Sequence, residues 1–164
     1  MGNPRPGIPP SKMDADIAKN KRALHDFKVI EKFEAGIELK GTEVKSIRDG
    51  KINLRDSFAR VEDGQVFLYG CDIQSYANAS YEQHLPKRPR RLLLHKKEIL
   101  KLYSHTQIKG LTLVALRAYW RNRHVKIELG VCRGKDHADR RETLKARVVD
   151  REAQREMANF NKRR

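Results

Sequence analysis

The chain has 164 residues, which is enough for one ordinary domain and too few for two. Its 36 lysines and arginines exceed its 21 aspartates and glutamates, so the formal net charge is +15. No apolar run approaches the ~20 residues of a membrane span, and the N-terminus lacks the hydrophobic core of a secretion signal. Two cysteines exclude a disulfide framework. We therefore expect a soluble, cytoplasmic protein with a polyanionic partner, nucleic acid before an anionic membrane surface.

The N-terminal region is predicted to be a flexible leader over residues 1–19. Four of the six prolines lie there, among few apolar residues. The folded domain is expected over residues 20–133. Its first strand is predicted at Phe27–Leu39, where apolar and polar residues alternate, with a bulge where Ile30 and Glu31 break the alternation.

A short helix and a hairpin are expected next. The helix is predicted from Gly41, and Gly50 suits its end. Phe58–Val61 and Val66–Tyr69 flank the segment Glu62–Gly64, in which an Asp-Gly pair supplies the positive φ of a tight turn. These residues predict two antiparallel strands.

The second half of the domain is predicted to hold a loop, a helix and another hairpin. Ile73–Tyr76 is expected to continue the second strand of the first hairpin, and a loop follows it. Leu92-Leu93-Leu94 is interpreted as the entry to a helix over His95–Tyr103. Leu111–Trp120 and Val125–Cys132 predict the second hairpin, because the latter alternates strictly.

This count of about five or six strands indicates a mainly β fold. Small sheets of this kind close on themselves to remove exposed edges. We therefore predict a small OB-like β-barrel with two or three short peripheral helices.

The C-terminal region, residues 134–164, is predicted to be a separate basic tail. As a helix it would align an apolar stripe but would set Arg147, Arg151 and Arg155 at i,i+4 spacing, where they repel. An isolated helix of this kind is marginal in water. We expect the tail to be disordered when free and helical against a polyanion.

Most of the charge lies in one segment, from Leu85 to Lys135. It holds fourteen bases and only two acids, Glu98 and Glu128, which is +12 of the total +15. A run of mixed sign would indicate a solvated surface. Charge of one sign over fifty residues favours phosphate binding, because self-repulsion must be offset.

Motifs for catalysis are weak. The segment Gly130–Asp136 is one residue short of a phosphate-binding loop and lacks its Ser/Thr. The six histidines show no ligand spacing, and no nucleophile elbow is present. We expect a protein that is not an enzyme and that has no metal and no cofactor. A Ser-His-Asp constellation from distant residues is the alternative that the sequence leaves open.

The tip of the second hairpin is more informative. Trp120 beside Arg121, Asn122 and Arg123 offers a stacking surface with phosphate or sugar donors. The equally weighted alternative is that Trp120 belongs to the core and the arginines to a solvated turn. The basic segment Asn20–Ala23 suggests a second contact, with an ordinary helix cap and linker as its alternative.

Several separated segments share the motifs of one family. They are Asn20–Phe27, Phe33–Ile37, Gly41–Arg48, Arg90–Leu94, Tyr119–Asn122 and Gly134-Lys135. With these segments in this order, the chain resembles the SmpB family of bacteria, also called SsrA-binding proteins. The Phe-Glu-Ala-Gly and Glu-Val-Lys-Ser segments make the resemblance specific.

The resemblance implies an OB-like RNA-binding protein that is not an enzyme. Such a protein binds the tRNA-like domain of tmRNA and helps to deliver it, with elongation factor Tu as an indirect partner, to ribosomes stalled without a stop codon. The tail is implied to enter the empty messenger channel as a helix. The stalled peptide is then tagged for degradation. The expected form is a monomer. The alternatives are a general single-strand RNA-binding or ribosomal OB protein and, less favoured, an RNA-processing enzyme.

The resemblance also assigns residues. Asn20, Glu34 and Leu93 match family positions implicated in the RNA interface. Glu34 would accept hydrogen bonds from base edges or from a 2′-hydroxyl. The alternative is that Glu34 is a salt-bridged surface residue. His137 stands one position earlier than in the family pattern, so stacking in the decoding centre would require a shifted backbone.

The predicted RNA contacts are Asn20, Lys21, Arg22, Glu34, Arg91, Leu93, Trp120, Arg121, Asn122 and Arg123. The predicted ribosome contacts in the tail are Lys135, His137, Arg140, Arg141, Lys145, Arg147, Arg151 and Arg155.

Overall fold

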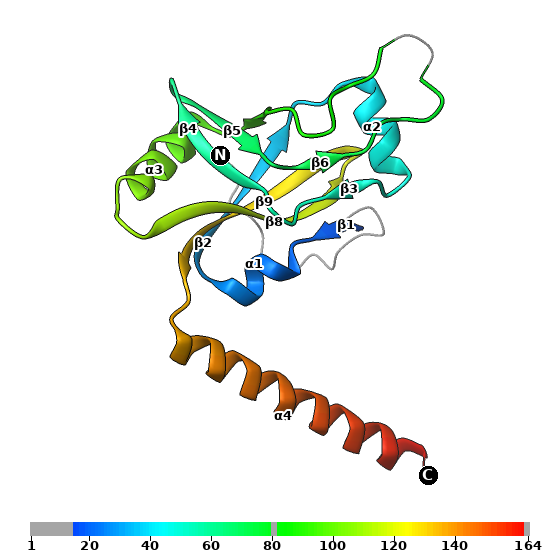
Figure 1. The fold of residues 1–164 in the computed structure, drawn as a ribbon, viewed down its shortest axis with the longest axis vertical. Coiled ribbons are helices and arrows are strands. Elements are labelled where there is room, and N and C mark those ends of the chain that lie inside the picture. Colours follow the sequence, from blue (N-terminus) through cyan, green and yellow to red (C-terminus); the bar gives the residue numbers. More distant parts are fainter. Residues whose placement is uncertain (1–14, 80–81, 163–164) are drawn as a thin grey trace.

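A computed structural model describes residues 15–79 and 82–162 (Figure 1). Six antiparallel strands form a closed ring, in which each strand pairs with the next and the last pairs with the first. The prediction of a mainly β, OB-like fold is confirmed. In ring order the strands are β4 (Phe58–Glu62), β5 (Gln65–Tyr69), β7 (Arg90–Leu93), β2 (Phe27–Ile37), β9 (His124–Gly134) and β8 (Leu111–Arg121).

Both predicted hairpins are confirmed. β4 and β5 are joined at Asp63-Gly64, whose φ angles are +50° and +73°, the pair of positive values that a tight hairpin turn needs. β8 and β9 are joined at Asn122 and Arg123, which adopt positive φ without a glycine. The predicted bulge in β2 is also present, between Val29 and Glu31.

The core fills the inside of the ring. Alternate residues of the strands point inward, and two helices add one buried apolar residue each, Ile47 from α2 (Gly41–Arg48) and Leu102 from α3 (Lys96–Thr106). In Figure 1, α2 and α3 lie on opposite sides of the ring. The predicted helices are therefore present, and they cover apolar side chains that the strands alone would expose.

A smaller apolar cluster lies outside the ring, where α1 (Lys21–Asp26) packs on the outer face of β8 and β9. Ala23 contacts Val114, Leu116 and Cys132 there. A side chain at Gly130 would begin 2.8 Å from Leu116 Cδ1. The close packing of this outer layer therefore requires glycine on β9.

Three segments differ from the sequence prediction. The predicted leader ends too late, because Asp16–Lys19 is a strand, β1, that pairs with β8; residues 1–14 lie outside the described part. Asp72–Ile73 (β6) does not extend β5 but pairs with β3 (Ile52–Asn53), because the chain turns at Gly70 with φ +71°. Leu92 and Leu93 belong to a strand, and α3 begins only at Lys96.

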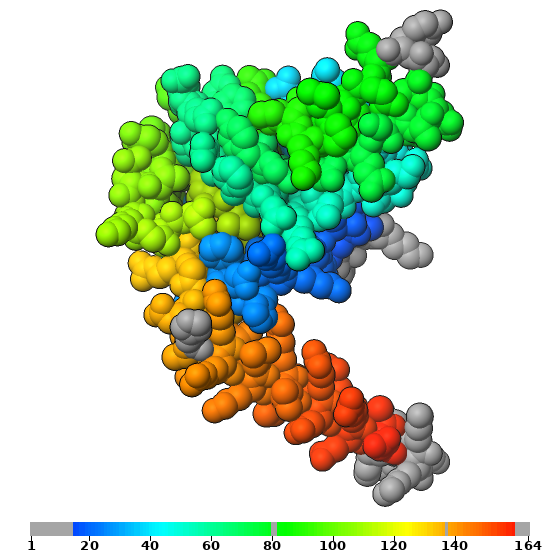
Figure 2. Space-filling view, viewed as in Figure 1, coloured from blue at the N-terminus to red at the C-terminus, as the bar shows by residue number. Residues whose placement is uncertain are grey.

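The C-terminal region is a single helix, α4 (His137–Lys162), which leaves the ring at the end of β9 (Figure 1). The sequence predicted a tail that is disordered when free. Here it is helical, and its side chains are exposed from residue 144 to 159. Figure 2 shows it projecting from the ring. No helix in residues 15–79 and 82–162 has the length and apolar character to cross a membrane.

Candidate nucleic-acid interface

The outer face of β2, β7 and the β8–β9 hairpin brings together many of the predicted RNA contacts. Two hollows of about 400 and 240 Å³ meet there, and Gly36, Leu93 and Lys126 line both. Glu34 lies in the larger hollow, and Trp120 with Arg123 in the smaller. We call this area the Leu93 surface.

The position of Leu93 on β7 determines its exposure. Side chains of β7 alternate between buried and exposed, and Leu93 is 50% exposed. Its pairing partner on β2 is Gly36, and a Cβ built on that glycine would lie 3.2 Å from Leu93 Cβ. The glycine therefore lets an apolar side chain lie close against the sheet between two hollows.

Glu34 is held by donors of this chain. Its Oε2 accepts hydrogen bonds from the Tyr119 hydroxyl and from Arg121 Nη1, the latter at 2.5 Å. Burial would raise the pKa of Glu34, but these two hydrogen bonds and the charges of Arg121 and Lys126 together outweigh it, so the pKa lies below its usual value. Glu34 is thus a carboxylate in an ion pair, the alternative considered from the sequence, and it fixes the Arg121 side chain at the hairpin tip.

Tyr119 is a residue that the sequence analysis missed. Burial and the nearby Glu34 carboxylate raise the pKa of its phenol far above the usual value. The Arg117 guanidinium lies 4.6 Å from its ring centroid, and Arg117 is itself paired with Glu128 at 3.2 Å. Alternation along β8 was the available signal, because it places Arg117, Tyr119 and Arg121 on one face.

The remaining tip residues are divided between core and surface. Trp120 is half-buried, packs against the core and also lines the smaller hollow, so its role as a stacking surface for RNA stays a prediction. Asn122 and Arg123 are exposed in the turn. Arg91 is exposed on β7 and pairs with Glu38 at 2.8 Å.

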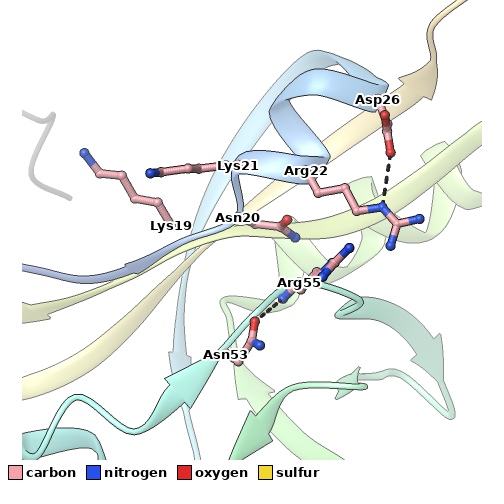
Figure 3. Close-up of a pocket in the computed structure, with 7 residues that line it drawn as sticks. All are labelled: Lys19, Asn20, Lys21, Arg22, Asp26, Asn53 and Arg55. Atoms are coloured by element: carbon pink, nitrogen blue, oxygen red, sulfur yellow. Dashed lines mark hydrogen bonds and ion pairs between the residues drawn. The ribbon is translucent and has the colours of Figure 1, made fainter.

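Asn20 requires a correction as an RNA contact. It is 2% exposed, and its Nδ2 donates to the carbonyl oxygens of Leu54 at 2.8 Å and Ala115 at 3.0 Å. Its Oδ1 accepts from Ala23 N–H and caps α1. Asn20 therefore positions α1 from inside, whereas Lys21 and Arg22 are exposed beside it (Figure 3).

The charge count from the sequence overstates the basic surface. Arg90 is completely buried, and its Nε donates to Glu43 Oε1 at 2.9 Å. Arg88 donates to both oxygens of the same carboxylate, at 2.6 and 2.8 Å. Glu43 is also fully buried. Two of the fourteen bases are thus paired with a buried carboxylate, which neutralises part of the charge counted from the sequence.

The base of the tail is joined to α1. Lys135 N–H donates to Asp26 O at 3.0 Å, and Lys135 Nζ donates to Leu24 O at 3.2 Å and to Thr143 Oγ1 at 3.1 Å. The Lys135 ammonium thus stabilises the joint between α1 and α4, and its predicted contact with the ribosome stays a prediction. His137 is the first residue of α4. Arg140 is half-buried, and the exposed tail bases are Arg141, Lys145, Arg147, Arg151 and Arg155.

The described residues contain no group of three or more His, Cys, Asp or Glu side chains that could hold a metal ion. Both cysteines are buried and unbridged, and burial raises their thiol pKa values, to about 12 for Cys71 and about 11 for Cys132.

Comparisons with known proteins agree with this organisation. The model of the SmpB protein family matches residues 17–159. The "SsrA-binding protein" of Carboxydothermus hydrogenoformans is 52% identical over 140 residues, covering 85% of this chain and 94% of the relative. The protein of the same name from Syntrophobacter fumaroxidans is 50% identical, covering 85% and 86%. A solved chain described as "tmRNA-SmpB: a journey to the center of the bacterial ribosome" is 45% identical, with a TM-score of 0.63 and coverage of 77% and 93%. Because the match includes the ring and most of α4, this chain belongs to the SmpB protein family.

Proposed function

We propose that this protein binds the tRNA-like domain of tmRNA and delivers it to stalled ribosomes in trans-translation, so that the incomplete peptide is tagged for degradation and the ribosome is rescued. The observation that carries the proposal is the family match over both the ring and the tail. The protein acts by binding, without a catalytic step, as a cytoplasmic monomer. Elongation factor Tu is an indirect partner, through the charged tmRNA.

The Leu93 surface is the proposed contact with the tRNA-like domain. Sequence-specific recognition of RNA uses unpaired bases, which stack on apolar or aromatic side chains. Leu93, half exposed between two hollows, offers such a contact, and Trp120 lines one of the hollows. Arg121, Arg123 and Lys126 lie at the same end of the β8–β9 hairpin and suit the phosphates of the same strand.

Glu34 has an indirect role in this proposal. Its carboxylate holds Tyr119 and Arg121, so the guanidinium is oriented before RNA arrives. A side chain that is already ordered loses less conformational entropy on binding. Loss of Glu34 would therefore weaken RNA binding without removing a direct contact.

The tail is the proposed contact with the ribosome, in the empty messenger channel near the decoding centre. Arg147, Arg151 and Arg155 are exposed at i,i+4 spacing along α4. Their mutual repulsion is relieved when phosphates of ribosomal RNA lie beside them. Formation of the helix and binding to the ribosome should therefore be coupled, because an unpacked helix is marginal by itself.

Separation of the two parts tests the proposal. A variant truncated before Gly134 should bind the tRNA-like domain normally and should fail to support peptide tagging on stalled ribosomes. Within the ring, Leu93→Ala should weaken binding, whereas Leu100→Ala, at a leucine on α3 that is 59% exposed, is the matched control. Full tagging by the truncated protein would contradict the two-part mechanism. Equal affinity for unstructured RNA would favour a general single-strand RNA-binding protein.

A further inference from the structure

We propose that Arg117 is a positioning residue for RNA binding, which fixes Tyr119 and, through Tyr119, the pair of Glu34 and Arg121 at the Leu93 surface. The inference rests on the proposed function, because it deepens the role given there to Glu34. Arg117 is itself held by β1, so that β1 takes part in RNA binding without touching the RNA.

A bulge in β8 directs Arg117 toward the site. The register of β8 against β9 shifts between Ala115 and Arg117, so that Leu116 is the extra residue. Ala115 and Ala118 belong to the core inside the ring, whereas Leu116 packs in the outer cluster beside α1. Two successive residues therefore lie on the outer side, and the second of them, Arg117, shares a face with Tyr119. Bulges re-aim side chains in this way next to functional sites.

Arg117 also balances two carboxylates that face each other. Glu34 on β2 is directly opposite Glu128 on β9, and Glu128 is in turn opposite Arg117 on β8. Like charges in such a cross-strand pair are destabilising. Arg117 Nε donates to Glu128 Oε2 at 3.2 Å, and Lys32 Nζ lies 3.7 Å from the other Glu128 oxygen. Because Glu128 has cations of its own, Arg121 stays paired with Glu34.

The Arg117 guanidinium is held over the Tyr119 ring. Its central carbon lies 4.6 Å from the ring centroid, while Nε donates to Glu128 and Nη1 donates to Asp16 Oδ1 at 2.9 Å. Burial would lower the pKa of Arg117, but the two carboxylates raise it above its ordinary value, so the group is charged. A planar group whose donors are directed at carboxylates on two different strands has little freedom to leave the ring.

Tyr119 transmits this placement to Glu34. Tyr119 is only 6% exposed, and its hydroxyl donates to Glu34 Oε2, the same oxygen that accepts from Arg121. Burial and the Glu34 carboxylate raise the pKa of Tyr119, whereas the Arg117 charge lowers it and so makes the hydroxyl a stronger hydrogen-bond donor. Arg117 therefore orders Tyr119, and Tyr119 orders Glu34 with Arg121 before RNA arrives. Side chains that are already ordered lose less entropy on binding.

β1 supplies the last link. Asp16 Oδ1 accepts from Arg117, and Lys19 Nζ lies 2.7 Å from Asp16 Oδ2. In the pairing of β1 with β8, Asp16 is opposite Tyr119 and Lys19 is opposite Arg117. A strand that covers the edge of the ring thus also carries the carboxylate that steadies the guanidinium. Loss of this carboxylate should therefore affect the Leu93 surface.

The test is a double-mutant cycle on affinity for the tRNA-like fragment. Arg117→Gln should weaken binding by roughly two- to five-fold, the range that a cation–π contact at a partly exposed site supplies. In a Tyr119→Phe background the same change should have no further effect, because the transmitting hydroxyl is absent. Arg60→Gln is the matched control and should leave affinity unchanged. The Arg60 guanidinium lies 5.2 Å from the Phe58 ring centroid on β4, which is opposite β2 in the ring.

Two readouts separate positioning from the other roles of an arginine. If Arg117 contacted a phosphate itself, Arg117→Gln would lower the log–log salt slope of binding by about 0.7–0.9, whereas loss of a positioning residue leaves the slope unchanged. If Arg117 served stability alone, urea unfolding would shift while the folded variant kept the wild-type affinity. Asp16→Asn, at an exposed position of β1, should reproduce the loss of affinity and should also add nothing to Tyr119→Phe.

Other outcomes overturn the inference. Additive losses in the cycle, a lower salt slope for Arg117→Gln, an equal loss in Arg60→Gln, or unchanged affinity in either Arg117→Gln or Asp16→Asn would each do so. Failure of the wild-type protein to bind the tRNA-like fragment would refute the proposed function instead, so the two failures are distinguishable.

Discussion

Replacing Glu43 with glutamine should destabilise the protein strongly, although the side chain keeps its size. Glu43 and Arg90 are completely buried, and Arg88 is 23% exposed. The amide would leave the buried Arg90 and the partly exposed Arg88 without a counter-charge, and removing one partner of a buried ion pair costs about 3–5 kcal/mol. Carbonyl oxygens of Cys71 and Pro86 still accept from Arg90, at 2.8 and 3.0 Å, so the lower end, about 3 kcal/mol, is expected.

Urea unfolding followed by the fluorescence of Trp120, the single tryptophan, measures this loss. Glu38→Gln is the matched control, because Glu38 pairs with Arg91 where the side chains are 58% and 43% exposed. Exposed pairs contribute about 0–1 kcal/mol. Equal losses in the two variants, or a loss below about 1 kcal/mol for Glu43→Gln, would refute the reasoning.

The effect should also depend on pH. Burial would raise the pKa of Glu43, but hydrogen bonds from Arg88, the Lys40 N–H and Arg90 bring it below its ordinary 4.5. A carboxyl whose pKa is lower in the folded state stabilises that state above its unfolded pKa, and this contribution is lost as pH falls through the folded pKa. The difference between wild type and Glu43→Gln should therefore shrink below about pH 4.5.

Three further outcomes are expected. Binding of the tRNA-like fragment should weaken steeply with salt, because phosphate contacts release counterions, and a flat log–log plot would exclude a basic interface. Gly36→Val should displace Leu93, whose Cβ would lie 3.2 Å from the new Cβ, and weaken binding several-fold, whereas Gly134→Ala has open space and should not. Ala153→Pro should cost roughly 3 kcal/mol of helix stability, visible as lost helical circular dichroism and reduced tagging, with unchanged unfolding of the ring.

The parts of the fold that sequence predicts well are governed by neighbouring residues. Asp63-Gly64 specifies its turn locally, and the alternation over Val125–Cys132 specifies a half-buried strand. β7 was not predicted because Arg90 occupies an inward position that normally carries an apolar residue. Its burial depends on Glu43, which is 47 residues away in sequence.

The candidate site was likewise predicted only in outline, because sequence shows residue types but not contacts between residues that are distant in the chain. Residue types identified Leu93 and the hairpin tip, but not the hydrogen bonds that Asn20 makes inside the fold. Its partners lie 34 and 95 residues away, and no local pattern indicates them. Tyr119 was missed because it contacts Glu34, which lies 85 residues away in sequence on another strand.

β1 has a consequence for handling the protein. β4 pairs with β8 only at Leu113 and Val114, and β1 covers the same edge of β8 further along, at Arg117–Tyr119. Removing residues up to Lys19 would leave backbone donors and acceptors there without partners, and an uncovered edge recruits strands from other molecules. Shortened proteins that start at Asn20 should therefore self-associate in a concentration-dependent way, whereas those that start before Asp16 should stay monodisperse.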